Sequence, residues 1–167
     1  MTFQRRDEDE LYQEHILDHY EDPYHRGKCP QCTHAHEDDN PLCGDVVRIE
    51  LALDPSGEKI LDAYFDGDGC CISQASASML VEHVEGKPLE DVKQFKAEDM
   101  LKLFGAKLTP NRQKCCLLSW RVLQQAIYSP GGARGGNESG GAAGVRKASE
   151  GNRASEANGK GDGARGG

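Results

Sequence analysis

The sequence predicts an α+β domain in which helices pack on one face of a small antiparallel sheet. Two observations lead to this. Residues 46–53 and 59–65 read as strands joined by a short turn, and only helical patterns follow them, up to residue 128. A hairpin followed by a run of helices is typical of α+β folds. The length of 167 residues fits one domain, which we place at residues 9–128.

The first predicted helix covers residues 9–20, after an N-terminal segment, 1–8, that we expect to be flexible. Its predicted apolar face is made of Leu11, Tyr12, Ile16, Leu17 and Tyr20. Pro23 ends it. His15 and His19 are four residues apart and could face one metal. We interpret them as solvated or packing side chains, because no carboxylate-bearing partner motif accompanies them.

A CxxC pair, Cys29 and Cys32, is followed closely by His34 and His36. These four residue types form a local zinc-ligand set. The pair could equally be redox-active, although the strand-then-helix setting of a thioredoxin-like motif is missing. A flexible loop whose thiols have no obligatory role is the third interpretation. The residues alone leave all three open.

The predicted hairpin follows a polar turn at residues 37–41. In its first strand, one side carries the apolar residues Val47, Ile49, Leu51 and Leu53. Residues 54–58, Asp-Pro-Ser-Gly-Glu, form the turn to the second strand.

Four helices are predicted after the hairpin, at residues 72–84, 89–95, 97–104 and 111–128. The first begins with Ser and Ala residues, which suit close packing. The predicted apolar face of the last consists of Leu117, Trp120, Leu123, Gln124 and Ile127, with Trp120 as a core anchor.

Residues 129–167 are expected to be a disordered tail, because Gly, Ala, Ser, Asn and Arg dominate there without apolar periodicity. The tail carries six Lys/Arg and four Asp/Glu, so the chain's net charge of −8 leaves about −10 on the remainder. Such an acidic body argues against nucleic-acid binding. No stretch is apolar and long enough for a membrane span, and the N-terminus lacks the apolar core of a signal peptide. We therefore expect a cytoplasmic protein.

Seven cysteines in such a chain indicate metal or sulfur chemistry rather than a disulfide framework. Three of them, Cys43, Cys70 and Cys115, lie at the edges of predicted elements, next to glycine, acid or lysine. Isolated cysteines are most often small buried apolar residues, but these positions suit exposed thiolates. Three thiolates and the Asp45 carboxylate make a tetrahedral zinc set, and they could also hold a [2Fe–2S] cluster. Asp45 is the weakest of these ligands and could yield to an incoming thiolate.

Four segments resemble the U-type iron–sulfur scaffold family, which comprises IscU, SufU and the N-terminal domain of NifU. They are residues 11–23, 40–45, 67–73 and 110–120, in the family's order. The resemblance implies a SufE/NifU-like fold over residues 11–128. It also implies the ligands Cys43, Cys70 and Cys115, with Asp45 completing or tuning the site. Cys71 and Cys116 fall on positions that the family motifs do not use.

Within the family, Lys114 and the Leu-Ser-Trp after the third cysteine are similar to SufU, whereas the short stretch from Cys70 to Cys115 is similar to IscU. The SufU likeness implies a zinc-bound sulfur acceptor, with zinc-dependent sulfurtransferase activity. The IscU likeness implies a scaffold, rather than an enzyme, that binds iron and builds a transient [2Fe–2S] cluster. Both imply a SufS- or IscS-like cysteine desulfurase and apo iron–sulfur or carrier proteins as partners.

In the scaffold role the candidate sulfur acceptor is Cys115, whereas in the SufU-like variant it is Cys43, and the sequence leaves both entry points open. We expect Lys114 and Arg112, together with a helix-start position, to lower the pKa of Cys115 and to steady a developing anion. Two alternatives belong to other classes: a structural zinc module for protein interaction, and a thiol redox protein using Cys29 and Cys32. Chelation should unfold the first, and the second should survive loss of Cys43.

Overall fold

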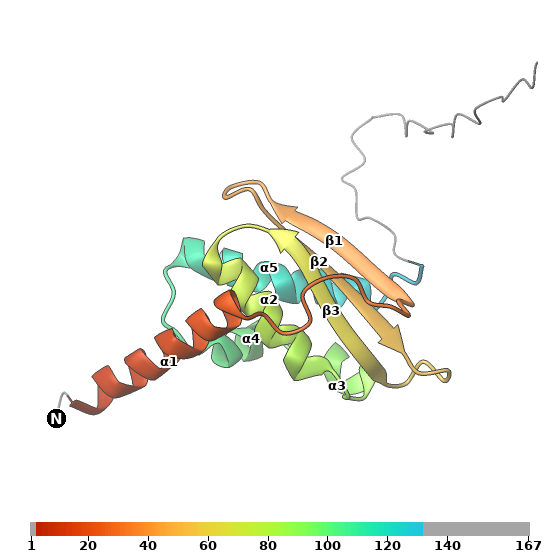
Figure 1. Cartoon of the computed structure of the whole chain (residues 1–167), viewed down its shortest axis with the longest axis horizontal. Helices are drawn as coiled ribbons and strands as arrows, with labels where there is room; N and C mark the ends of the chain where they lie inside the picture. Colours follow the sequence, from red (N-terminus) through yellow and green to blue (C-terminus); the bar gives the residue numbers. More distant parts are fainter. Residues whose placement is uncertain (1–2, 132–167) are drawn as a thin grey trace, which may run out of the picture. The chain divides into compact units, whose positions relative to one another are not determined.

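The computed structural model describes residues 3–131 of the chain. Its three strands, β1 (His34–Asn40), β2 (Asp45–Leu53) and β3 (Ile60–Asp68), form one antiparallel sheet in the order β1-β2-β3 (Figure 1). Five helices accompany the sheet, so the predicted α+β class is confirmed. Within the described residues, no helix combines the length and apolar character that crossing a bilayer requires.

The hairpin of β2 and β3 forms as its alternation predicts. Val47, Ile49 and Leu51 are completely buried on one face, and Ile49 is paired with Phe65 of β3. The connecting turn is closed by Asp54, whose Oδ1 accepts the backbone N–H groups of Glu58 and Lys59 at 2.8 and 3.0 Å. An aspartate that satisfies turn amides in this way fixes the register of the two strands.

Strand β1 was not predicted, because its sequence, His-Ala-His-Glu-Asp-Asp-Asn, has no apolar alternation. Residues 37–41, expected to be a turn, mostly belong to this strand, and the turn lies at residues 41–44. Pairing with β2, from His34 opposite Leu51 to Asn40 opposite Asp45, holds β1 in place. Polar edge strands of this kind are common because charge discourages pairing with other chains.

The outer edge of β1 is partly covered by the chain after the last helix. Ala35 N–H donates to Ser129 O at 3.2 Å, and Gly131 N–H donates to Thr33 O at 2.9 Å. The tail predicted to be disordered from residue 129 therefore begins with three residues that pair with Thr33, His34 and Ala35. The rest of that prediction, 132–167, lies outside the described residues.

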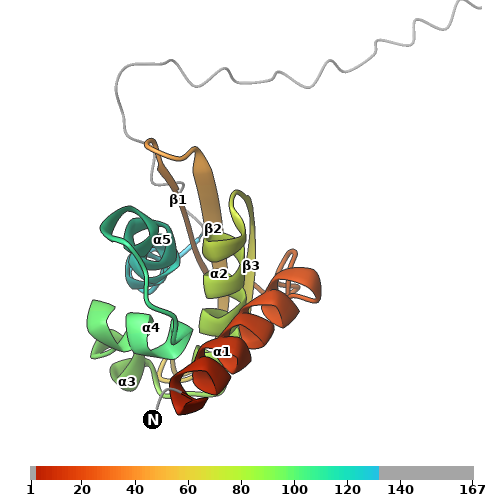
Figure 2. The ribbon, with the colours of Figure 1, turned by 90° about the vertical axis from the view of Figure 1, so that its left-hand side faces the viewer.

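Helices α2 (Cys71–Val84) and α5 (Pro110–Ala126) pack on one face of the sheet (Figure 2). Two short helices, α3 (Leu89–Lys93) and α4 (Ala97–Phe104), connect them. The small residues predicted to favour close packing do so: buried Ser76 of α2 and Ser119 of α5 place their hydroxyls 3.3 Å apart.

The buried face of α5 differs from the predicted one. It consists of Cys115, Cys116, Leu118, Ser119, Val122, Leu123 and Ala126. Of the predicted face, Leu123 and Ile127 are buried, whereas Leu117, Trp120 and Gln124 are half-buried. Trp120 lies at the edge of the core and donates from Nε1 to Phe95 O at 2.9 Å. A polar indole N–H favours such an edge position, where it can reach an acceptor.

Helix α1 (Phe3–Glu21) begins before the predicted start at residue 9 and includes most of the segment expected to be flexible. It packs on α2, but its predicted apolar face is confirmed only in part: Ile16 packs against the core, whereas Tyr12, Leu17 and Tyr20 are between 43 and 50% exposed. Among residues 12–21 of this helix, whose side chains the structure describes, the buried residue is His19, and its Nδ1 lies 2.8 Å from Ser78 Oγ. His19 is thus a packing side chain, as interpreted, and His15 is exposed.

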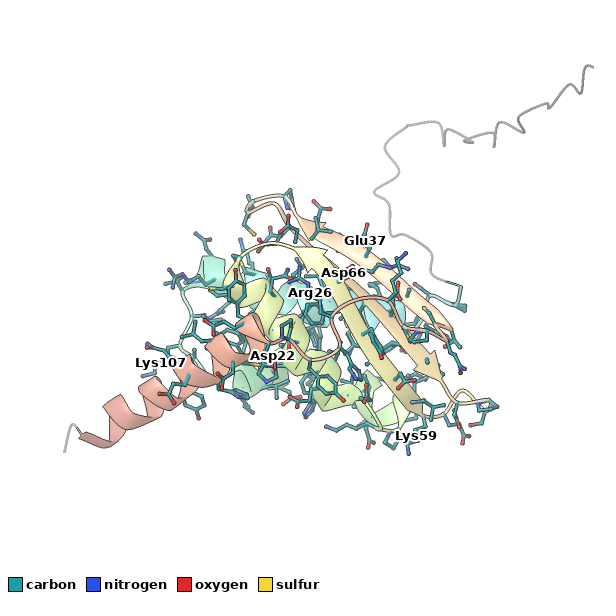
Figure 3. The ribbon with its side chains drawn as sticks, in the orientation of Figure 1. Asp22, Arg26, Glu37, Lys59, Asp66 and Lys107 are labelled. Carbon is teal, nitrogen blue, oxygen red and sulfur yellow. The ribbon has the colours of Figure 1, made fainter. Side chains whose placement is uncertain are left out.

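The segment between α1 and β1 covers the outer edge of β3. Gly27 N–H donates to Phe65 O at 2.8 Å, and Phe65 N–H donates to His25 O at 3.1 Å. Arg26 lies beside Asp66 here, with its Nε 3.9 Å from Asp66 Oδ1 (Figure 3). Both edges of the sheet therefore carry additional chain.

Candidate metal centre

Three chain segments converge at one end of the sheet: the turn between β1 and β2, the link from β3 to α2, and the first turns of α5 (Figure 1). Each segment contributes one predicted cysteine. Cys43 lies in the turn, Cys70 is the N-cap of α2, and Cys115 lies in the second turn of α5. The fold thus assembles residues that are up to 72 positions apart in sequence.

Asp45, the first residue of β2, lies at the centre of this cluster and is 2% exposed. Its Oδ2 accepts the thiols of Cys43 at 3.1 Å and Cys70 at 3.3 Å. Its Oδ1 accepts the backbone N–H of Cys70 at 2.9 Å. A single buried carboxylate therefore organises two of the three cysteine segments.

Cys43 Sγ and Cys115 Sγ are 3.5 Å apart. Together with a carboxylate oxygen of Asp45, their ligand atoms all lie within 4.8 Å of one another, and the part of the chain that the structure describes contains no other group of this kind. Cys70 joins this group through Asp45. Cys43 and Cys70 are exposed, whereas Cys115 is 8% exposed. All four predicted ligands are therefore brought together.

The donor set fits zinc. Typical Zn–S and Zn–O bonds in a tetrahedral site place neighbouring ligand atoms about 3.4–3.8 Å apart. The sulfur–sulfur distance of 3.5 Å and the sulfur–oxygen distances of 3.1 and 3.3 Å are close to that range. Three sulfurs and one carboxylate also match the thiolate-rich sets that hold iron–sulfur clusters.

Gly69 makes room for the central carboxylate. A Cβ atom at this position would lie 2.6 Å from Asp45 Oδ1 and 2.8 Å from Ser73 Oγ, closer than such atoms approach. Gly44, between Cys43 and Asp45, has φ +71°, a conformation that glycine adopts without steric cost. These two glycines explain why the ligand motifs carry glycine next to a ligand.

The charges in the site differ from the sequence-based expectation. Burial raises the pKa of Cys115 well above its usual value, and the nearby thiols of Cys43 and Cys70 add to this effect. The expected lowering of this pKa is therefore wrong for the protein without metal. Burial also opposes ionisation of Asp45, but hydrogen bonds from the thiols and from Cys70 N–H outweigh it and lower the Asp45 pKa. A buried anion surrounded by thiols is an environment that a cation would stabilise.

Lys114 and Arg112 are exposed and line a cavity beside the sulfurs of Cys43 and Cys115. This cavity of about 360 Å³ is also lined by Asn40, Leu42 and Asn111. The two cations therefore face the space that an incoming group would occupy.

The other cysteines and histidines singled out from the sequence are not members of this group of ligand atoms. None of Cys29, Cys32, His34 and His36 belongs to a metal-binding group within the described residues, so the local zinc-set interpretation is not supported. Cys71 is exposed, and Cys116 is fully buried, which raises its pKa to about 12.

Sequence reasoning missed Arg121, which ties β1 to α5 next to the cysteine turn. Its Nη2 lies 2.9 Å from Asp38 Oδ2 and donates to Asp39 O at 3.0 Å. No sequence pattern could reveal this contact, because its partners are 82 residues apart and β1 itself was not predicted.

A family model described as NifU-like N terminal domain matches residues 11–132. The chain belongs to this family. The matched range contains all four predicted ligand residues and every strand of the described sheet. The family resemblance inferred from the four sequence motifs is thereby confirmed.

The chain is similar to curated members of the NifU-like family. It is 35% identical to the zinc-dependent sulfurtransferase SufU of Bacillus subtilis, over 71% of this chain and 90% of that protein. It is 32% identical to the iron–sulfur cluster assembly scaffold protein IscU of Thermotoga maritima, over 70% and 92% of the two chains. Both subtypes recognised in the sequence thus appear among its relatives.

A solved structure supports the same fold. It comes from Fervidobacterium islandicum AW-1, and its description proposes that it is an iron–sulfur cluster assembly scaffold protein for the SUF system. The two chains superpose with a TM-score of 0.57 at 29% identity, over 68% of this chain and 94% of that one. The NifU-like fold therefore extends over nearly the whole of the described domain.

Proposed function

We propose that this protein is a scaffold and sulfur-relay protein of iron–sulfur cluster assembly. It accepts sulfur from a cysteine desulfurase and assembles or passes on a cluster at Cys43, Asp45, Cys70 and Cys115. The observation that carries this proposal is the arrangement of three thiols around one buried carboxylate, with two of the cysteines exposed. The names of its SufU and IscU relatives support it.

The same four residues would hold zinc in the resting protein. Zinc, when bound, would keep the cysteines as thiolates and so offset the pKa increase that burial causes at Cys115. Asp45 completes the set as the weakest donor. Its hydrogen bonds from Cys43 and Cys70 position it independently of a metal.

The sulfur-transfer step requires an accessible thiolate. In a desulfurase persulfide, the outer sulfur is the electrophile. A thiolate of this protein attacks it, the sulfur–sulfur bond breaks, and the desulfurase cysteine leaves as a thiolate. We assign the first attack to Cys43, because it is exposed whereas Cys115 is 8% exposed. Cys115, 3.5 Å away, is placed to receive the sulfur next.

Lys114 and Arg112 would stabilise the negative sulfur species during this exchange, since they line the cavity beside both sulfurs. In the scaffold role, iron and sulfide are the cargo, and Cys43, Cys70 and Cys115 supply the thiolates that hold it. In the last step the cluster passes to an apo iron–sulfur protein or to a carrier protein.

Desulfurase turnover, measured with and without the full-length protein, tests this function. Zinc-loaded protein should stimulate turnover and metal-free protein should not, if the SufU-like activity dominates. A transferable cluster built on iron-loaded protein, without stimulation by the zinc form, would instead indicate the IscU-like activity. Cys70→Ser should abolish both activities. Cys71→Ser is the matched control, because Cys71 is the exposed neighbour outside the site. Full activity in Cys70→Ser would contradict the proposal.

A structural zinc module is the second candidate, but the exposure of Cys43 and Cys70 argues against it. Structural zinc sites are closed and usually contain only Cys and His ligands. Such a module would bind zinc tightly, unfold on chelation and leave desulfurase turnover unchanged.

A further inference from the structure

We propose that Cys29 and Cys32 form a reversible intramolecular disulfide, a second sulfur site separate from the metal centre. The two cysteines are the ends of a turn whose central residues are Pro30 and Gln31. The ends of such a turn have Cα atoms within about 7 Å, and disulfides join Cα atoms about 4.4–6.8 Å apart. The local backbone therefore already has the spacing that this bond requires.

The two thiols are unequal in a way that suits stepwise exchange. Cys32 is exposed and can meet a reagent from solution, whereas Cys29 is 6% exposed. The Cys32 thiol donates to His34 O at 3.3 Å, and the Cys29 sulfur accepts the backbone N–H of Gln31. Because Cys32 is exposed and Cys29 is buried, Cys32 is the attacking thiol and Cys29 is the thiol that resolves the mixed disulfide.

Hydrogen bonds to β2 hold this turn against the sheet. Cys29 N–H donates to Glu50 Oε2 at 2.8 Å, and Arg48 Nε donates to Glu50 Oε1 at 2.7 Å. Glu50 is itself buried, at 7% exposure. On the other side of the turn, Thr33 N–H donates to Leu51 O at 2.8 Å. Both cysteines are therefore anchored to β2, which limits the conformational entropy lost when the disulfide forms.

Strand β1 separates this pair from the metal centre. The pair precedes His34, which lies opposite Leu51, whereas the metal centre follows Asn40, opposite Asp45 (Figure 1). Seven strand residues at about 3.4 Å each place the two sites on the order of 20 Å apart. Exchange at Cys29 and Cys32 is consequently independent of the ligand cysteines and of the proposed function.

The oxidant is a low-molecular-weight disulfide. The Cys32 thiolate attacks one of its sulfurs and releases one small thiolate, which leaves a mixed disulfide on Cys32. The Cys29 thiolate then attacks the Cys32 sulfur and releases the second small thiolate. Two electrons pass from the cysteine pair to the small disulfide. The two protons of the cysteine thiols pass through solvent to the released thiolates, and a dithiol reductant reverses the reaction.

The test equilibrates the zinc-loaded full chain with graded ratios of oxidised to reduced glutathione. Free thiols are then alkylated, disulfides are reduced and labelled with a second reagent, and each cysteine is mapped by mass spectrometry. Cys29 and Cys32 should change label together in one two-electron transition, without stable glutathione adducts. The same transition should occur in Cys43→Ser, so the outcome does not depend on the metal centre.

Two further variants complete the experiment. In Cys32→Ser, Cys29 should remain a free thiol at every glutathione ratio, whereas Cys71→Ser, which removes another exposed thiol, should leave the transition unchanged. Cys32 is used because its exposure makes folding of the variant secure. The proposal is overturned if both thiols stay reduced at the most oxidising ratio, or if Cys32 accumulates a glutathione adduct while Cys29 stays free.

Discussion

Cys43 Sγ and Cys115 Sγ lie 3.5 Å apart, although 72 residues separate them along the chain. One sulfur is on a surface turn and the other is largely buried in α5. The pair therefore places a solvent-exposed sulfur next to a buried one. Asp45 provides the buried charge beside them, because its Oδ2 accepts the Cys43 thiol at 3.1 Å.

Removing the charge of Asp45 should weaken zinc binding by at least about tenfold. In Asp45→Asn the side chain keeps its size and can still accept from Cys70 N–H, but it no longer supplies an anionic donor. Isothermal titration with zinc measures the effect. Asp39→Asn is the control. Asp39 lies on the neighbouring strand β1, and its hydrogen bonds here are made by its backbone N–H and C=O. Equal affinities in both variants would contradict a ligand or tuning role for Asp45.

Gly69→Ala should displace the Asp45 carboxylate and reduce zinc stoichiometry, because the added Cβ would lie 2.6 Å from Oδ1. The variant should also unfold about 1–3 kcal/mol more easily, as overpacked sites do. Zinc content and urea unfolding measure the two effects. Gly57→Ala is the control, because this turn glycine has φ +74° but a methyl group added to it would meet no atom within 4 Å. It should lose stability without losing zinc.

Arg121→Ala should weaken metal binding several-fold while changing the free energy of unfolding by less than about 1 kcal/mol. The ion pair to Asp38 is half-exposed and so contributes little stability, but it fixes β1 to α5 beside the Cys43 turn. Lys93→Ala, which removes an ion pair to Glu90 far along the chain, serves as the comparison. A zinc affinity that falls equally in both variants would show that Arg121 has no specific role.

Tyr24→Phe should reduce the loss of unfolding free energy that the protein undergoes at high pH. The hydrogen bond from its hydroxyl to Glu85 Oε1, at 2.7 Å, raises the pKa of Tyr24 to about 12. In the unfolded chain this pKa is about 10. Because the folded value is higher, the associated stability is present below pH 10 and is lost as pH rises from 10 to 12. Urea unfolding at about pH 8 and about pH 11 should therefore show a smaller alkaline loss in Tyr24→Phe than in the original protein.

The parts of the fold that could be predicted from the sequence are those marked by patterns within a short stretch of residues. The β2–β3 hairpin alternates every second residue: its apolar positions Val47, Ile49 and Leu51 are buried, and Leu53, at the irregular end of the strand, is half-buried. The helices after it were found because their apolar periodicity and bounding glycines and prolines are equally local. In contrast, β1 is polar throughout, and only its partner β2 makes it a strand.

Helix faces were predicted less well, because burial depends on the neighbour rather than on the residue. Leu17 of α1 is 50% exposed, whereas the polar His19 is buried against Ser78 of α2. In α5, the buried side includes Cys115, Cys116 and Ser119 because α2 approaches closely there. Average hydrophobicity cannot show that small polar residues will occupy a helix contact.

The sequence by itself determined the α+β class, the hairpin and the family, and it singled out the four candidate ligands, since these depend on short motifs and local periodicity. Only the tertiary structure showed that Asp45 is the buried centre of the cluster and that Cys43 is accessible while Cys115 is not. It also reversed the expected pKa shift of Cys115. Burial and through-space charge arise when distant segments pack together, so no window of sequence contains them.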